Sequence, residues 1–136
     1  MASTSPLENS LLPLSEAESR IFALLETAFG DTLWDVLRVY IDQGERYSAA
    51  LQEATTCTHW QEAVRQGLKI AALASDLDFR PVVTAARALS DAVYEDHTAH
   101  ARRNAAQMVV LEFERSVLLL ASRYPGLVAS QEASVA

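Results

Sequence analysis

The sequence predicts an all-α protein: an up-down, antiparallel four-helix bundle with an additional N-terminal helix. Alanine and leucine dominate the 136 residues and β-branched runs are short, a composition that favours helix over strand. Only four glycines and four prolines are present, which leaves little material for hairpins or long loops. Apolar residues recur at three- and four-residue steps along most of the chain, the spacing of one helix face.

Charge and composition exclude several classes of protein. A nucleic-acid-binding chain needs a basic stripe, but the net charge is −7 and the eleven Lys and Arg residues are interleaved with acids. No stretch reaches the roughly 20 apolar residues of a membrane span, and residues 1–14 lack the pattern of a secretory signal. Cys57 is the single cysteine, which excludes an internal disulfide. We therefore expect a cytoplasmic protein with no nucleic-acid or membrane partner.

The chain is long enough for one domain, expected over residues 15–125. Residues 1–14 mix Ser, Pro, Asn and Leu without a period and are predicted to form a flexible arm. Ser15 and Glu18 have the spacing of a capping box, in which each side chain accepts a hydrogen bond from a backbone N–H. This box predicts a helix over about 16–28, ended by Gly30 in the left-handed conformation that favours glycine.

Four longer helices are expected to follow, joined by short connections that make neighbours antiparallel. The first should end near residue 54, and Gly44 within its apolar stripe predicts close packing against another helix. The second should end near residue 75, before a turn at 76–80, and the last should end at Pro125-Gly126, followed by a flexible tail over 126–136. The residues expected at the starts of these helices are Asp31 or Thr32, Thr58 with Gln61 as a second capping box, Pro81, and Asp96 or Thr98.

The helix that begins near Trp60 has a second face of interest. With Val64, Leu68 and Ala71 placed inward at 100° per residue, Ile70 and Leu73 point outward among polar residues. An exposed apolar cluster with a polar rim is typical of a surface that docks a partner. The alternative is that another helix or the N-terminal arm covers these two residues. The outward set consists of His59, Glu62, Gln66, Lys69, Ile70 and Leu73.

Signatures of catalysis and metal binding are absent from the sequence. It contains no glycine-rich phosphate loop, no paired cysteines and no His-Glu-x-x-His motif. His97 and His100 have metal-ligand spacing on a helix, but they lie at a predicted helix start beside Arg102 and Arg103, which favours a solvated helix end. Cys57 has no basic neighbour close in sequence, so a reactive thiolate is not expected. The sequence predicts no metal, no cofactor and no enzymatic activity.

Residues 65–72, with the sequence RQGLKIAA, resemble the central helix of histidine-containing phosphotransfer (HPt) domains. That helix reads Ala-His-x-Leu-Lys-Gly-Ala-Ala or close to it. Residues 29–31 before a long helix, and residues 85–90, look like the flanking helices of the family. The resemblance covers roughly residues 15–124 and is most specific at Leu68-Lys69. It implies a four-helix bundle that contacts a response-regulator receiver domain or a histidine kinase.

Two departures from the family pattern decide the expected chemistry. Gln66 stands where the family has its phospho-accepting histidine, and Ile70 replaces a glycine that leaves room for the receiver. Phosphoryl transfer needs a neutral imidazole nitrogen as nucleophile. The nitrogen of a carboxamide is not comparably nucleophilic, because its lone pair is delocalised into the carbonyl group. Transfer through Gln66 is therefore excluded, whereas Lys69 matches the lysine of the family.

The sequence therefore predicts a non-catalytic, HPt-like signalling protein that binds a two-component partner without relaying phosphate. The residues expected at the contact are Gln66, Lys69, Ile70, Leu73, Glu62 and His59. One alternative is an active phosphotransferase that uses another histidine, such as His59, or whose native histidine has been substituted at position 66. A further alternative is an unrelated helical adaptor, or a homodimer with Ile70 and Leu73 at its seam.

Overall fold

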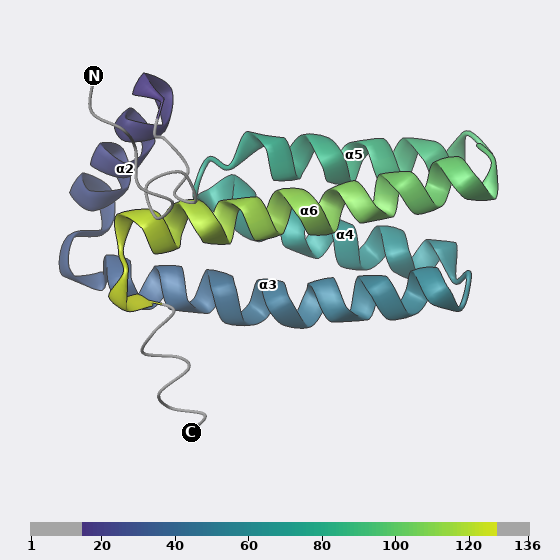
Figure 1. The fold of residues 1–136 in the computed structure, drawn as a ribbon, viewed down its shortest axis with the longest axis horizontal. Helices are drawn as coiled ribbons and strands as arrows, with labels where there is room; N and C mark the ends of the chain where they lie inside the picture. Colours follow the sequence, from purple (N-terminus) through teal and green to yellow (C-terminus); the bar gives the residue numbers. More distant parts are fainter. Residues whose placement is uncertain (1–14, 128–136) are drawn as a thin grey trace, which may run out of the picture.

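The computed structural model describes residues 15–127, and in this range the chain is helical and contains no strand. The predicted arm, residues 1–14, and residues 128–136 of the predicted tail lie outside the described residues. The elements are α2 (Glu16–Phe29), the short 3-10 helix η1 (Gly30–Thr32), α3 (Leu33–Thr56), α4 (Trp60–Asp76), α5 (Arg80–Tyr94) and α6 (Ala99–Arg123). The long helices α3 to α6 run alongside one another, and α2 crosses one end of them (Figure 1).

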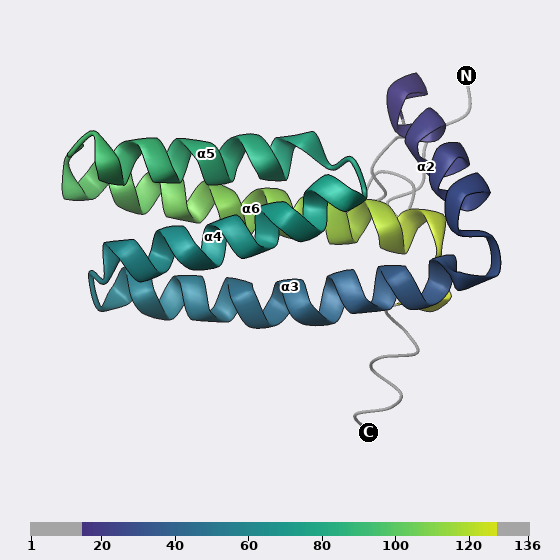
Figure 2. The same cartoon turned by 180° about the vertical axis from the view of Figure 1, so that it is seen from behind.

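The four long helices form a closed circuit in which α3 contacts α4, α4 contacts α5, α5 contacts α6 and α6 returns to α3. In Figure 1 α6 lies in front of α4, and in the view from behind α4 lies in front of α6 (Figure 2). The α3–α6 side and the α4–α5 side therefore form opposite faces of the molecule. No helix within residues 15–127 combines the length and the apolar content needed to cross a bilayer.

The capping side chains predicted at the starts of α2 and α6 are confirmed. The backbone N–H of Glu18 donates to Ser15 Oγ at 3.1 Å, and the N–H of Ser15 donates to Glu18 Oε1 at 2.9 Å, which completes the predicted capping box. Gly30 ends α2 as predicted, but its φ of +53° is paired with a ψ of −126°, which is not the left-handed helical conformation expected there. Thr98 caps α6 by accepting from the N–H of Ala101 at 3.1 Å. These contacts join residues at most three apart, so the sequence suffices to predict them.

The three connections between the long helices share one backbone conformation. Each contains a residue with positive φ: Thr58 (57°), Asp78 (60°) and Asp96 (56°). The N–H of the next residue then donates to an alanine carbonyl five residues earlier in the preceding helix, with N–O distances of 2.8–2.9 Å. This closure is of the Schellman type, which ends a helix by reversing the chain through one left-handed residue.

The capping box predicted at Thr58 and Gln61 is wrong. Thr58 closes α3 instead of opening α4, and its hydroxyl donates to the carbonyl of Cys57 at 2.6 Å. The N-cap of α4 is His59, which makes no side-chain capping hydrogen bond. The left-handed backbone needed for the chain reversal takes position 58 away from the extended conformation of an N-cap.

We predict that Thr58→Gly raises the free energy of unfolding by about 1 kcal/mol, because a left-handed backbone costs a β-branched residue about that much and costs glycine almost nothing. Thr58 is exposed, so little packing is lost. Urea denaturation would measure the change. The matched control is Thr84→Gly at an exposed site within α5. The backbone there is helical, so glycine should not raise the free energy of unfolding. A loss of stability in Thr58→Gly would contradict the assigned backbone.

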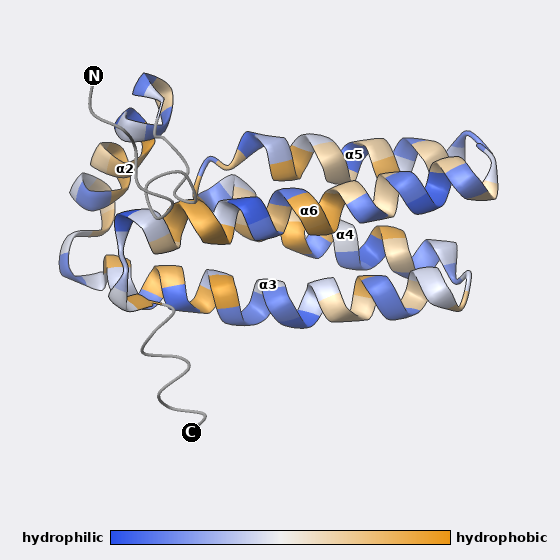
Figure 3. Cartoon of the chain, in the orientation of Figure 1, coloured by the Kyte–Doolittle hydropathy of each residue, from blue (hydrophilic) through white to orange (hydrophobic). Residues whose placement is uncertain are grey.

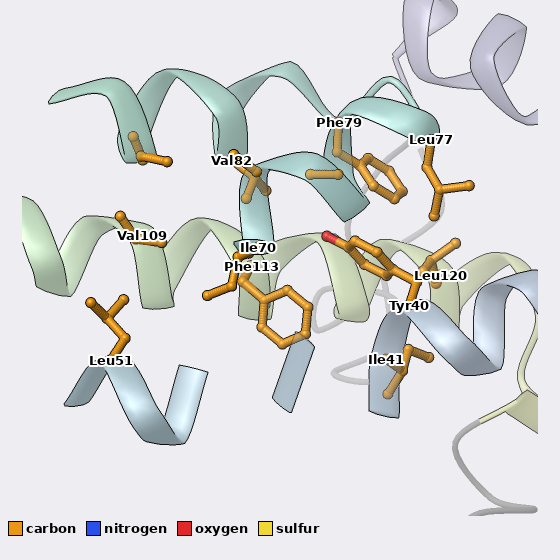
Figure 4. Close-up of a cluster of buried hydrophobic side chains, with 14 of the residues drawn as sticks. Tyr40, Ile41, Leu51, Ile70, Leu77, Phe79, Val82, Val109, Phe113 and Leu120 are labelled. Atoms are coloured by element: carbon orange, nitrogen blue, oxygen red, sulfur yellow. The ribbon is translucent and has the colours of Figure 1, made fainter. Parts of the chain in front are cut away.

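The core runs along the bundle axis and contains one buried polar pair. Tyr40, 2% exposed, lies among apolar side chains from several helices (Figure 4). Its hydroxyl is 2.6 Å from Ser116 Oγ, which in turn donates to the carbonyl of Phe113, so Tyr40 donates to Ser116. Burial raises the pKa of Tyr40, which keeps the donor proton in place. Both hydroxyls are thereby satisfied, as buried polar groups must be.

Gly44 lies where α3 meets α6. A Cβ atom built on Gly44 would overlap the ring of Phe113, and that ring is itself 2% exposed. The close packing of helices predicted at Gly44 is therefore confirmed.

The helix α2 is attached near the end of α6. Glu26 Oε2 accepts from the hydroxyl of Tyr124 at 2.5 Å and from Arg123 Nη2 at 3.3 Å. The hydrogen bond from Tyr124 lowers the pKa of Glu26, while desolvation raises the pKa of Tyr124 to about 12. Phe22 adds an edge-to-face contact with the Tyr124 ring, with centroids 6.0 Å apart. These contacts hold α2 across one end of the bundle.

Candidate functional site: the exposed face of α4

The helix α4 turns a different face to the bundle from the predicted one. Val64 and Ala71 are buried as expected, but Leu68, expected inward, is 46% exposed. The buried residues of α4 are Ala63, Val64, Gln66, Gly67, Ile70, Ala71 and Ala74. This arc is wide because α3 and α5 cover α4 from two sides.

The exposed positions predicted for Gln66 and Ile70 are wrong. Gln66 is 7% exposed and Ile70 is fully buried, in the same core cluster as Phe113 (Figure 4). The alternative that the apolar outward residues are covered therefore holds for Ile70. Leu73 is partly buried against the core, near Val36 and Val39 of α3.

The carboxamide of Gln66 is held within its own helix. Gln66 Nε2 donates to Glu62 Oε2 at 2.6 Å, and the half-buried Glu62 also lies 3.6 Å from Arg65 Nη1. On the next residue, a Cβ on Gly67 would lie 3.4 Å from Leu89 Cδ2, so α5 closely approaches α4 here. Position 66 thus presents neither a nucleophile nor an open path for an incoming phosphoryl group.

The predicted site residues do not form one exposed surface. Lys69 is exposed on α4, and its ammonium lies 5.4 Å from the centroid of the Tyr47 ring on α3. His59 is exposed at the N-cap of α4. Glu62 and Leu73 are half-buried, and the remaining two of the six are buried. A contact surface on α4 must therefore be built around other residues than Gln66 and Ile70.

One exposed surface does form where α4 runs beside α5. Leu68 is 46% exposed and Tyr94, at the end of α5, is 68% exposed. They border a shallow concavity of about 580 Å³ floored by Val64. We define the α4–α5 face as Gln61, Arg65, Leu68, Lys69, Ala72 and Tyr94. It combines two large apolar side chains with two cations, in a chain whose net charge is −7.

The other histidines lie at the α5–α6 connection. His97 Nε2 is 3.7 Å from Glu95 Oε1, and the His100 ring is 3.2 Å from Asn104 Nδ2. Both rings belong to exposed residues, in keeping with the solvated helix start expected there. In the described part of the chain, no group of three potential metal ligands gathers.

Sequence reasoning did not identify two residues, Tyr94 at the α4–α5 face and Arg102 near the start of α6. Tyr94 follows directly after the predicted stripe of α5, and an aromatic residue just off a core stripe is a signal that could have found it. Arg102 carries no such signal: its guanidinium lies 5.7 Å from the centroid of the Trp60 ring and its Nη2 is 2.7 Å from Asp96 Oδ1. The contact with Trp60 joins the starts of α4 and α6, and only the folded bundle brings them together.

Comparisons of the chain with protein-family models, with curated proteins and with solved structures found no match.

Proposed function

We propose that the protein is a cytoplasmic, non-catalytic, HPt-like signalling protein. It binds a receiver domain or a histidine kinase of a two-component system through the α4–α5 face, and it relays no phosphate. The observation that supports this proposal most is the exposed α4–α5 face, where Leu68 and Tyr94 lie beside the cations Arg65 and Lys69. Leu68 and Lys69 carry the most specific part of the resemblance to HPt domains, and the buried carboxamide at position 66 cannot accept phosphate.

The composition of the α4–α5 face suits a protein partner. Leu68 and Tyr94 offer exposed apolar area, and burying such area is the main source of affinity at the centre of an interface. Lys69 and Arg65 lie beside them and complement an acidic surface, which favours fast association and the correct orientation.

The first experiment measures binding of the full chain to a panel of purified receiver domains and kinase phosphotransfer modules by titration calorimetry. For a cognate partner we expect Leu68→Glu to weaken binding at least tenfold, or about 1.4 kcal/mol. Leu24→Glu is the matched control, since Leu24 lies on α2 and is 68% exposed. Equal losses in both variants, or no binding to any member of the panel, would refute the proposed contact.

The second experiment tests the absence of a relay. Incubated with a phosphorylated receiver, the wild-type chain should gain no acid-labile phosphate. Gln66→His should also remain unlabelled, because position 66 is 7% exposed. Label on His59, His97 or His100 of the wild-type chain would instead favour an active phosphotransferase.

A further inference from the structure

A cavity of about 290 Å³ lies between α2, the start of α5 and the second half of α6. At this end of the bundle α2 and α6 both carry apolar segments, drawn in orange in Figure 3. Five buried side chains form the floor of the cavity: Phe22, Phe79, Val82, Ser116 and Leu119. The hydroxyl of Ser116 is already paired with Tyr40 and with the carbonyl of Phe113. The floor therefore offers an occupant mainly apolar contacts.

The rim of the cavity is mainly acidic. Glu18, Asp78 and Glu112 line it together with Arg115. Glu18 and Asp78 already accept hydrogen bonds from residues nearby in the sequence. The half-buried Glu112 has no hydrogen-bond or ion-pair partner among residues 15–127, and a carboxylate can only accept. The rim therefore suits an occupant that brings N–H donors and no acid.

The chain enters α2 at the edge of this cavity. The N-cap Ser15 exchanges two hydrogen bonds with Glu18, which lines the rim. The buried residues of α2, Phe22 and Leu25, lie in its second half, so no buried side chain of its own holds the first turn of α2 on the bundle. The segment that immediately precedes Ser15, residues 11–14, therefore starts beside the rim.

Residues 11–14 have the composition that the cavity requires. They read Leu-Leu-Pro-Leu and carry no charge, so the acidic rim does not repel them. A large apolar residue before an N-cap often packs on the fourth residue of the helix, but here that residue is the exposed Ser19. Leu14 therefore needs another apolar contact. Pro13 has no N–H and favours an extended backbone at Leu12, which lowers the cost of burying the segment.

We propose that residues 11–14 fold back along α2 and fill this cavity, with the leucine side chains on its apolar floor and a backbone N–H donating to Glu112. The distance is within reach. Four extended residues span about 13 Å, whereas the path from Ser15 to Phe22 is about 10 Å of helix. The predicted flexible arm is then limited to residues 1–10.

A segment of the same chain has an advantage over any other occupant of the cavity. Because it is joined directly to Ser15, its effective concentration at the cavity is that of a very short linker, in the millimolar range. A free ligand or a partner has to compete with this. Docking also fixes the start of α2 on the bundle, as the hydrogen bond from Tyr124 to Glu26 fixes its end. The inference does not depend on the function proposed for the α4–α5 face.

Methyl nuclear Overhauser spectra of the full chain test the position of the segment. We expect cross-peaks from the methyl groups of Leu12 and Leu14 to those of Val82 and Leu119, which belong to the cavity floor. Leu7, in the same arm but outside the segment, is the matched control and should give none. Absence of the expected cross-peaks would overturn the proposal.

Benzene, a small neutral probe, tests whether the segment or an external ligand occupies the cavity. In the wild-type chain the segment should exclude benzene, so the methyl signals of Val82 and Leu119 should not shift on titration. Leu12→Asp/Leu14→Asp should release the segment and let benzene shift both signals, whereas Leu7→Asp should behave like the wild type. Circular dichroism would show that the variants keep their helices. Equal responses of the wild type and the double variant, whether both shift or neither does, would overturn the proposal.

Discussion

Ile70→Ala is expected to lower the free energy of unfolding by about 3 kcal/mol, because it leaves a cavity in a packed core. Ile70 is fully buried, whereas Leu68, two residues earlier on the same helix, is 46% exposed. Leu68→Ala should therefore cost less than about 1 kcal/mol. Urea denaturation, with the slope m compared between variants, would measure both changes.

This pair of variants decides which face of α4 packs inward. The sequence-based arrangement places Leu68 in the core and Ile70 on the surface, so it predicts the opposite order of losses. A larger loss for Leu68→Ala than for Ile70→Ala would show that α4 is rotated from its position in the structure. It would also return Gln66 to the exposed position in which the HPt resemblance places it.

Gly44→Ala is expected to lower the free energy of unfolding by about 3 kcal/mol. Its methyl group would overlap the buried ring of Phe113, and overpacking of a rigid core typically costs 1–3 kcal/mol and sometimes more. Thermal and urea denaturation would both report the loss.

The matched control is Gly67→Ala on α4, where the new methyl group would meet only Leu89 Cδ2, at an ordinary contact distance of 3.4 Å. Alanine is a better helix former than glycine by up to about 1 kcal/mol, so this variant should be as stable as the parent or more so. If Gly44→Ala behaved like Gly67→Ala, the close crossing of α3 and α6 would be contradicted. Phe113→Leu should also reduce the cost of Gly44→Ala, because the two positions are in contact.

Helix ends could be predicted from the sequence where one local contact determines them. The box of Ser15 with Glu18 and the cap at Thr98 depend on residues three positions apart, and Pro81 at the start of α5 depends on its own ring. The N-cap role predicted for Thr58 is wrong because the chain reversal between α3 and α4 imposes a left-handed backbone on this residue. A side-chain pattern carries no information on that requirement.

The face of α4 was harder to predict for a physical reason. The helix is rich in alanine, with Gly67 in its middle, so few large side chains define its apolar direction. The size and apolar character of Leu68 predict an inward position for it. The face of α4 that packs inward is instead determined by α3 and α5, which cover the helix and bury Ile70 and the amide of Gln66. The contact of Arg102 with Trp60 could not be predicted from a local pattern either, because 42 positions separate the two residues in the sequence.

The three left-handed connections also bear on how the chain folds. Each joins two helices that are neighbours in space, so the α3–α4, α4–α5 and α5–α6 pairs need only short loops to close. The packing of α6 against α3 instead closes a loop of several tens of residues, with an entropic cost that grows with the logarithm of its length. Most contacts in the bundle are therefore local, and proteins of low contact order fold in microseconds to milliseconds. Docking of α6 on α3 across Gly44 is then the step in which the largest loss of chain entropy must be recovered.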